Sequence, residues 1–215
     1  MQIIFLILAL GGMCRALYGE IWVVEQDFIQ IDKKQVYEMA KKEGFSSLKQ
    51  PQYCFYDSKD REYTYLVPFA DLNALESYRE KAREPKQAVL LSSILNFTVS
   101  SLQELQPTLS YGFAKHLTPL PYAAYLIYTV LPEAEKAFRD KLRLTVLQHQ
   151  RSAYCWGVWK VLYGAELPKY VLWHFASDEK SLEAQLKAVR PDIHSKWVRR
   201  QEEGRAILVP LLSST

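Results

Sequence analysis

The sequence predicts an α+β protein built from two copies of one unit, in the order strand, helix, strand, strand, helix, strand. Three observations lead to this prediction. Runs rich in aromatic and β-branched residues alternate with segments of helical periodicity, the same order of elements occurs twice, and a proline-containing stretch at 106–121 separates the two occurrences. Because 49% of the 215 residues are hydrophobic, the chain can bury a sizeable core.

The first segment differs from the rest of the chain. An unbroken apolar run at 3–10 is followed by Cys14 and Ala16, which is typical of a signal peptide (residues 1–16) that is cleaved next to small residues. The run is shorter than the roughly 20 apolar residues that span a bilayer, so no transmembrane span is expected after cleavage. Alternatives are an uncleaved buried strand, since the basic n-region is missing, and lipid modification of Cys14, although Met13 fits a lipobox poorly. We expect an exported protein, periplasmic or secreted.

The first repeat, residues 20–105, has four expected strands and two expected helices. The strands are rich in aromatic and β-branched residues and cover 20–28, 53–56, 62–69 and 88–102. Asp32 can cap a helix that ends at Gly44. Asp71 can cap the other helix, whose apolar residues at helical spacing are Leu72, Leu75, Tyr78 and Ala82.

The second repeat, residues 122–215, follows the linker at 106–121 and has the same order of elements. Its expected strands cover 123–130, 154–163, 169–175 and 205–212. Pro132 begins a helix with one face formed by Phe138, Leu142, Thr145, Val146 and His149. Ser177 can cap the next helix, and an added short helix at 193–203 is expected to stop at Gly204. Two short identities favour duplication: Tyr53-Cys54 recurs as Tyr154-Cys155, and Phe69-Ala70 as Phe175-Ala176.

A strand–helix–strand–strand–helix–strand unit is the ferredoxin-like plan, in which helices cover one face of an antiparallel sheet. The strands are nevertheless apolar on both faces. In the strand at 154–163, Trp156 and Val158 share one face, while Cys155, Trp159 and Val161 share the other. Since a solvated sheet face would be polar, the second face needs its own cover. Two repeats packed sheet to sheet would provide it.

In this arrangement the chain resembles the dimeric α+β barrel superfamily in a tandem, single-chain form, which includes antibiotic-biosynthesis monooxygenase-like and NIPSNAP-like proteins and relatives that bind haem. The resemblance rests on the element order, the aromatic-rich strands and the segment at 186–212. It implies a pseudo-dimeric α+β barrel and, as one functional alternative, a haem-binding or cofactor-light monooxygenase-like enzyme. Haem-degrading relatives place a ligating histidine near the end of the second helix, a region that His194 matches loosely. They also use an asparagine on the first strand, and 21–28 and 123–130 have none.

No catalytic or metal-binding motif stands out in the sequence. The four histidines lack metal-ligand spacing, no GxSxG or phosphate-binding glycine loop is present, and the net charge of +3 is not gathered into a nucleic-acid-binding run. Cys54 and Cys155 are expected to be buried in strands, and the sequence leaves open whether they form a disulfide. We therefore expect no metal and favour a non-enzymatic module that binds a ligand or interacts with a partner.

The candidate ligand-binding residues are Tyr65, Trp159, Tyr170, His174 and His194. His174 and Tyr170 share one face of their strand. If that face looks into the barrel, they would meet aromatic side chains of neighbouring strands and could line a pocket for a small apolar or aromatic ligand. The alternative is a histidine that is hydrogen-bonded at a sheet surface.

Overall fold

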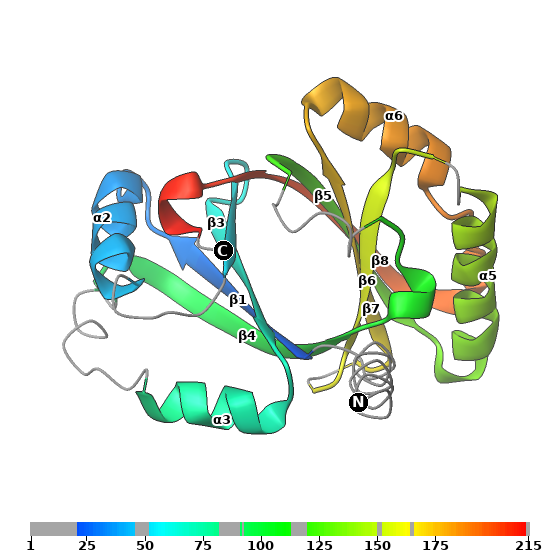
Figure 1. The fold of residues 1–215 in the computed structure, drawn as a ribbon, viewed down its shortest axis with the longest axis horizontal. Helices are drawn as coiled ribbons and strands as arrows, with labels where there is room; N and C mark the ends of the chain where they lie inside the picture. Colours follow the sequence, from blue (N-terminus) through cyan, green and yellow to red (C-terminus); the bar gives the residue numbers. More distant parts are fainter. Residues whose placement is uncertain are drawn as a thin grey trace, which may run out of the picture.

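Eight strands form one closed antiparallel barrel in the order β1-β3-β2-β8-β5-β7-β6-β4 (Figure 1). The computed structural model describes residues 21–45, 52–81, 91, 93–112, 120–149, 152–163 and 166–213. The strands are β1 (Ile21–Ile29), β2 (Tyr53–Asp57), β3 (Glu62–Phe69), β4 (Leu95–Leu105), β5 (Tyr122–Val130), β6 (Cys155–Val161), β7 (Lys169–Ala176) and β8 (Val198–Leu208). The longer helices are α2 (Lys34–Phe45), α3 (Leu72–Lys81), α5 (Glu135–Gln148) and α6 (Glu179–Val189).

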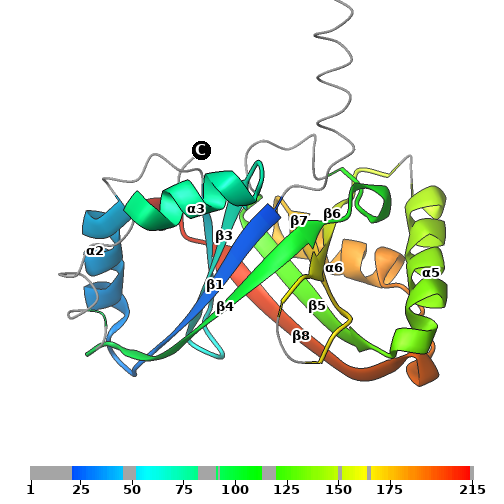
Figure 2. The same cartoon turned by 90° about the horizontal axis from the view of Figure 1, so that it is seen from below.

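Each half of the chain contributes four adjacent strands to the barrel. The first half supplies β4-β1-β3-β2 and the second supplies β8-β5-β7-β6. Helices α2 and α3 lie outside the first four strands, and α5 and α6 lie outside the second four (Figure 2). The expected α+β class is confirmed, and closure of the barrel gives the apolar inner faces the cover that they need.

The two halves meet at two short seams. At one, β2 pairs with β8 only through Phe55–Leu208 and Tyr56–Ile207. At the other, β4 pairs with β6 through the three residues of 103–105. Within each half, by contrast, β1 pairs with β4 and β5 with β8 along nearly their whole lengths. The barrel is therefore closed, but only short stretches of strand pairing join its two halves.

The interior of the barrel is filled by large aromatic side chains. Trp22 meets Trp159 edge to face with ring centroids 5.5 Å apart, and Phe55 lies 5.5 Å from Trp173. All four side chains are at most 3% exposed. Buried aromatic rings of this size supply much of the hydrophobic stabilisation of such a core.

The expected short helix at 193–203 is wrong, and the last strand, expected at 205–212, is β8 at Val198–Leu208. Only a 3₁₀ turn at Ser195–Trp197 is present, and β8 then runs through Gly204 beside β5. The many charged residues of this segment suggested a solvated helix. The strand period is seen at the end of β8, where Ala206 and Leu208 pack in the barrel core and Ile207 between them is 55% exposed.

Other boundaries also differ from expectation. The strand expected at 88–102 is β4 at Leu95–Leu105. The cap of α6 is Asp178, which accepts a hydrogen bond from the Ser181 amide, and not Ser177. In α3, Leu75 is buried as expected, whereas Leu72 is 52% exposed.

The two sequence identities that favoured duplication do not occupy matching positions. Cys54 packs with the residues beneath the helices of the first half, whereas Cys155 packs inside the barrel. Phe69 and Phe175 differ in the same way. Both cysteines are buried free thiols.

Two expectations concern segments that are not fully described. The leader at 1–16 lies outside the described residues, as do 113–119 of the expected linker. Among the helices that are described, none is long and apolar enough to cross a membrane.

Candidate functional site

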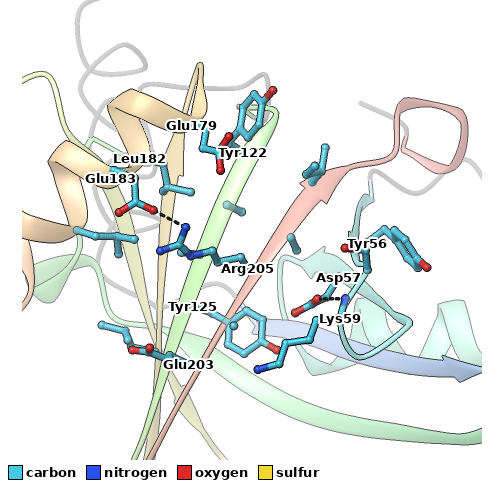
Figure 3. Close-up of a pocket in the computed structure, with 18 of the residues that line it drawn as sticks. Tyr56, Asp57, Lys59, Tyr122, Tyr125, Glu179, Leu182, Glu183, Glu203 and Arg205 are labelled. Carbon is cyan, nitrogen blue, oxygen red and sulfur yellow. Dashed lines mark hydrogen bonds and ion pairs between the residues drawn. The ribbon is translucent and has the colours of Figure 1, made fainter.

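A groove of about 690 Å³ lies on the outside of the barrel, between α6, the outer faces of β5 and β8, and the β2–β3 turn (Figure 3). This volume is within the range of small-molecule sites. The floor is apolar and is formed by Ala124 and Leu126 of β5 with Leu182 and Leu186 of α6. The turn at 57–60 forms the opposite wall.

The groove exists because β2 leaves β8 after two paired residues. Beyond that point no described strand covers the adjoining part of β8, so the inward-facing Tyr125 also borders the groove. The Tyr125 ring lies across Gly204, where an added Cβ would be closer than 3.0 Å to the phenol oxygen. Gly204 is thus required for the close approach of this ring.

Two ion pairs join α6 to β8 along the groove. Arg205 pairs with Glu183, and Arg190 pairs with Glu203 at 2.8 Å. All four side chains are more than a third exposed, so solvent screening leaves each pair a small contribution to stability. They instead offer charged groups on both sides of an apolar floor.

Buried carboxylates lie near the inner end of the groove. Asp57 is 6% exposed and accepts a hydrogen bond from the Lys59 amide at 2.8 Å. Glu62, its cross-strand neighbour, accepts from Thr64 and from Gln26, and burial raises its pKa. Burial, followed by the charges of nearby carboxylates including Glu62 and Asp57, also raises the pKa of Tyr125. The phenol at this end is therefore a hydrogen-bond donor at neutral pH.

The expected ligand-binding residues are not gathered in one place. Trp159 points into the barrel, where its ring packs against Trp22. His174 and Tyr170 point away from the barrel, so the condition for their pocket is not met. Tyr65 lies on the corresponding outer face of the first half.

The outward histidine is held by a helix. His174 is fully buried, and its Nδ1 accepts a hydrogen bond from Gln185 Nε2 of α6 at 3.1 Å. The same Gln185 amide bonds to both backbone groups of Cys155. His194 is exposed and caps the 3₁₀ turn by accepting from the Lys196 amide.

A buried polar cluster between β1 and α2 was not predicted from the sequence. Asp27, 1% exposed, accepts hydrogen bonds from Tyr37 at 2.5 Å and Thr98 at 2.6 Å, and pairs with Lys41 at 2.8 Å. The Tyr37 and Tyr65 hydroxyls are 2.9 Å apart. The polar residues Glu25, Gln26 and Asp27 within a strand that is apolar at both ends were the available signal, but the partners of Asp27 come from elements that only the fold brings together.

Three of the four histidines lie in the parts of the chain that the structure describes. His149, His174 and His194 do not line the groove, and none of the three belongs to the set that fills the barrel interior. In the parts of the chain that the structure describes, no group of three or more histidine, cysteine, aspartate or glutamate side chains could hold a metal ion.

Solved structures share this architecture at low sequence identity. A candidate monooxygenase from Fusobacterium nucleatum subsp. nucleatum is similar with a TM-score of 0.62 and 14% identity, covering 89% of this chain and 93% of its own. A candidate monooxygenase from Lactobacillus acidophilus gives 0.59 and 8%, covering 88% and 94%. This chain has the dimeric α+β barrel fold. A haem-binding protein from Thermus thermophilus has the same dimeric α+β barrel, with a TM-score of 0.53 and 14% identity over 90% of this chain and 93% of that protein.

Sequence comparisons add no closer relationship. No protein-family model matches the chain, and no curated protein matches it at a significant level. At these identities the structural likeness establishes the fold, and function has to be argued from the site.

Proposed function

We propose that this dimeric α+β barrel is a binding protein for a small amphipathic molecule with an apolar or aromatic body, which it takes up in the groove between α6, β8 and the β2–β3 turn. The observation that carries the proposal is the groove itself, with its apolar floor and the Tyr125 hydroxyl at its inner end. The ligand body lies on Leu182 and Leu186, and its polar groups meet the rim charges.

Two further features belong to the same proposal. The protein is exported by its leader at 1–16, and its two halves arose by duplication of a ferredoxin-like unit, giving repeats at 20–105 and 122–215. The matching strand orders of the two halves support duplication, although the short identities noted above do not.

Binding can be tested with 1-anilinonaphthalene-8-sulfonate, an amphipathic aromatic dye. We expect saturable fluorescence enhancement with the folded protein, and at least fivefold weaker binding in Ile207→Glu, because Ile207 lines the groove and is 55% exposed. Leu147→Glu is the matched control, since Leu147 is 60% exposed and lies on α5 away from the groove. Equal binding by both variants, or no binding by the unmodified protein, would refute the groove as the site.

The names of the structural relatives suggest a second candidate, a haem-binding or monooxygenase-like enzyme. The positions of the histidines disfavour haem, as described above. Titration with haemin separates the two proposals. A Soret shift lost in His174→Ala or His194→Ala would favour the enzyme, and dye binding without a Soret shift would favour the binding protein.

A further inference from the structure

A line of tyrosines leads from the groove to the buried cluster of the first half. Tyr56 borders the groove, its ring turned away from the other groove residues (Figure 3), and the ring centroid is 4.6 Å from that of Tyr63. Tyr63 is in turn 4.5 Å from Tyr37. Tyr63 and Tyr37 have no exposed surface, whereas Tyr56 is partly exposed. Consecutive rings are therefore in contact along a path from the solvent side to the core.

Each buried tyrosine of this line donates its hydroxyl proton to a carboxylate. Tyr63 bonds to Glu38 at 2.6 Å, and Tyr37 bonds to Asp27 at 2.5 Å. Hydrogen bonds to a charged acceptor are short and strong. Burial raises the pKa of both phenols, so neither ionises at neutral pH. A phenol becomes a strong acid on losing an electron, and here the proton would have an acceptor already in place.

The second half provides an internal comparison. Tyr63 pairs across the sheet with Asp27 and Tyr56, and in the second half Tyr170 pairs with Tyr128 and Lys160. In the first half, the helix residue Tyr37 packs on Tyr63. In the second half, the corresponding helix residue is Phe138, which packs on Tyr170 with ring centroids 5.1 Å apart.

The second half has a different polar arrangement at this place, in which Tyr170 donates its hydroxyl to Glu135 at 2.6 Å and Lys160 pairs with the same carboxylate at 2.7 Å. The same barrel is built in the second half without the outer tyrosine, the inner hydroxyl or the aspartate. A buried ion pair is often no more stabilising than apolar residues of similar volume. What is particular to the first half is the line of three tyrosines in ring contact that ends at Asp27.

We propose that Tyr56, Tyr63 and Tyr37 form a relay that moves a single oxidising equivalent from the partly exposed Tyr56 ring to Tyr37. The co-reactant is a one-electron oxidant that reaches Tyr56 from solvent. It takes an electron from Tyr56, whose proton passes to water. Tyr63 then gives an electron to Tyr56, its own proton moving to Glu38, and Tyr56 regains a proton from water.

The last transfer ends at Tyr37. Tyr37 gives an electron to Tyr63, Glu38 returns its proton to Tyr63, and the Tyr37 proton passes to Asp27. The net change is one electron to the oxidant, a neutral Tyr37 radical and a protonated Asp27.

The charge around Tyr37 favours this end point. One ammonium, that of Lys41, faces two carboxylates, Asp27 at 2.8 Å and Glu25 at 3.3 Å. The cluster is thus negative before the electron leaves and neutral afterwards. Lys41 keeps Glu25 as a partner when Asp27 is protonated. The Tyr65 hydroxyl, 2.9 Å from that of Tyr37, can hydrogen-bond to the radical oxygen.

The relay can be tested on the full chain with hexachloroiridate(IV), an outer-sphere one-electron oxidant, followed by rapid freezing and EPR spectroscopy. We expect the signal of a neutral tyrosyl radical, reduced at least fivefold in Tyr37→Phe and formed at least fivefold more slowly in Tyr63→Phe. Phe138 occupies the position of the second half that matches Tyr37, so Tyr37→Phe is expected to fold. Tyr163→Phe is the control, because Tyr163 is 81% exposed and lies outside the line.

Three outcomes would overturn the relay: no radical in the unmodified protein, an unchanged signal in Tyr37→Phe, or an unchanged rate in Tyr63→Phe. A signal that disappears in Tyr163→Phe would likewise place the radical elsewhere. Dye binding in the groove is measured separately, so failure of the relay leaves the proposed binding function intact.

Discussion

Replacing Lys41 by leucine should destabilise the protein strongly, whereas replacing Lys41 and Asp27 together should not. The Lys41 and Asp27 side chains are only 9% and 1% exposed, and their charged atoms are 2.8 Å apart. With an effective dielectric constant of about 20, the Coulomb attraction over this distance is about 6 kcal/mol, part of which offsets the loss of hydration. Removing one partner of such a pair costs about 3–5 kcal/mol. We expect that loss for Lys41→Leu at pH 7.

The double variant Asp27→Val/Lys41→Leu should recover most of this loss, to within about 1.5 kcal/mol of the unmodified protein. In the second half the helix residue four positions after Phe138 is Leu142, which is 3% exposed, just as Lys41 follows Tyr37. An apolar side chain is therefore compatible with this place in the barrel. Tyr37 can then donate its hydrogen bond to Tyr65.

Urea unfolding followed by circular dichroism gives the free energies, and the two single variants with the double variant complete a double-mutant cycle. Asp27→Val alone should be milder than Lys41→Leu, since Lys41 keeps Glu25. A double variant as unstable as Lys41→Leu, or a loss below about 1 kcal/mol for that single change, would refute the reasoning.

Two other stability predictions concern His174 and the glycines beneath aromatic rings. Burial lowers the pKa of His174 to about 4, below its unfolded value of about 6.5, so the unfolded chain binds the proton first as the pH falls. Stability should be complete above pH 6.5 and decline by about 3 kcal/mol towards pH 4, and unfolding curves at several pH values should show a flatter profile for His174→Gln. Gly204→Ala should lower stability by about 1–3 kcal/mol because its Cβ would collide with the Tyr125 ring, and a Tyr125→Leu background should remove most of this loss in thermal unfolding. Gly157→Ala should do the same through a collision with the Trp159 ring, with no effect of the Tyr125 background.

The architecture could be predicted from the sequence because it depends on local patterns. Strands with apolar residues of both parities require two covered faces, and the closed barrel with helices outside it provides them. The terminal strand was placed wrongly because its charges and Gly204 are also typical of a helix and its end. This segment is a strand because β8 pairs with β5, and that is a contact between distant segments of the chain.

The candidate sites were less predictable for a similar reason. Strand parity places Tyr170 and His174 on the same face of their strand, but it does not tell which face lies inside the barrel. The groove depends on how early β2 departs from β8, and the polar cluster on the meeting of Asp27 with Lys41 of α2. Neither feature has a local signature.

The short β2–β8 seam has a consequence for association between molecules. Along most of β8, at 198–206, no described strand pairs with the side opposite β5, so backbone donors and acceptors there could pair with a strand from another chain. Charged side chains such as Arg200, Glu202 and Arg205 lie along this stretch, and charge on an open edge discourages intermolecular pairing. The seam that opens the groove thus also leaves a strand edge, and we expect the charges of that edge to oppose pairing with another chain.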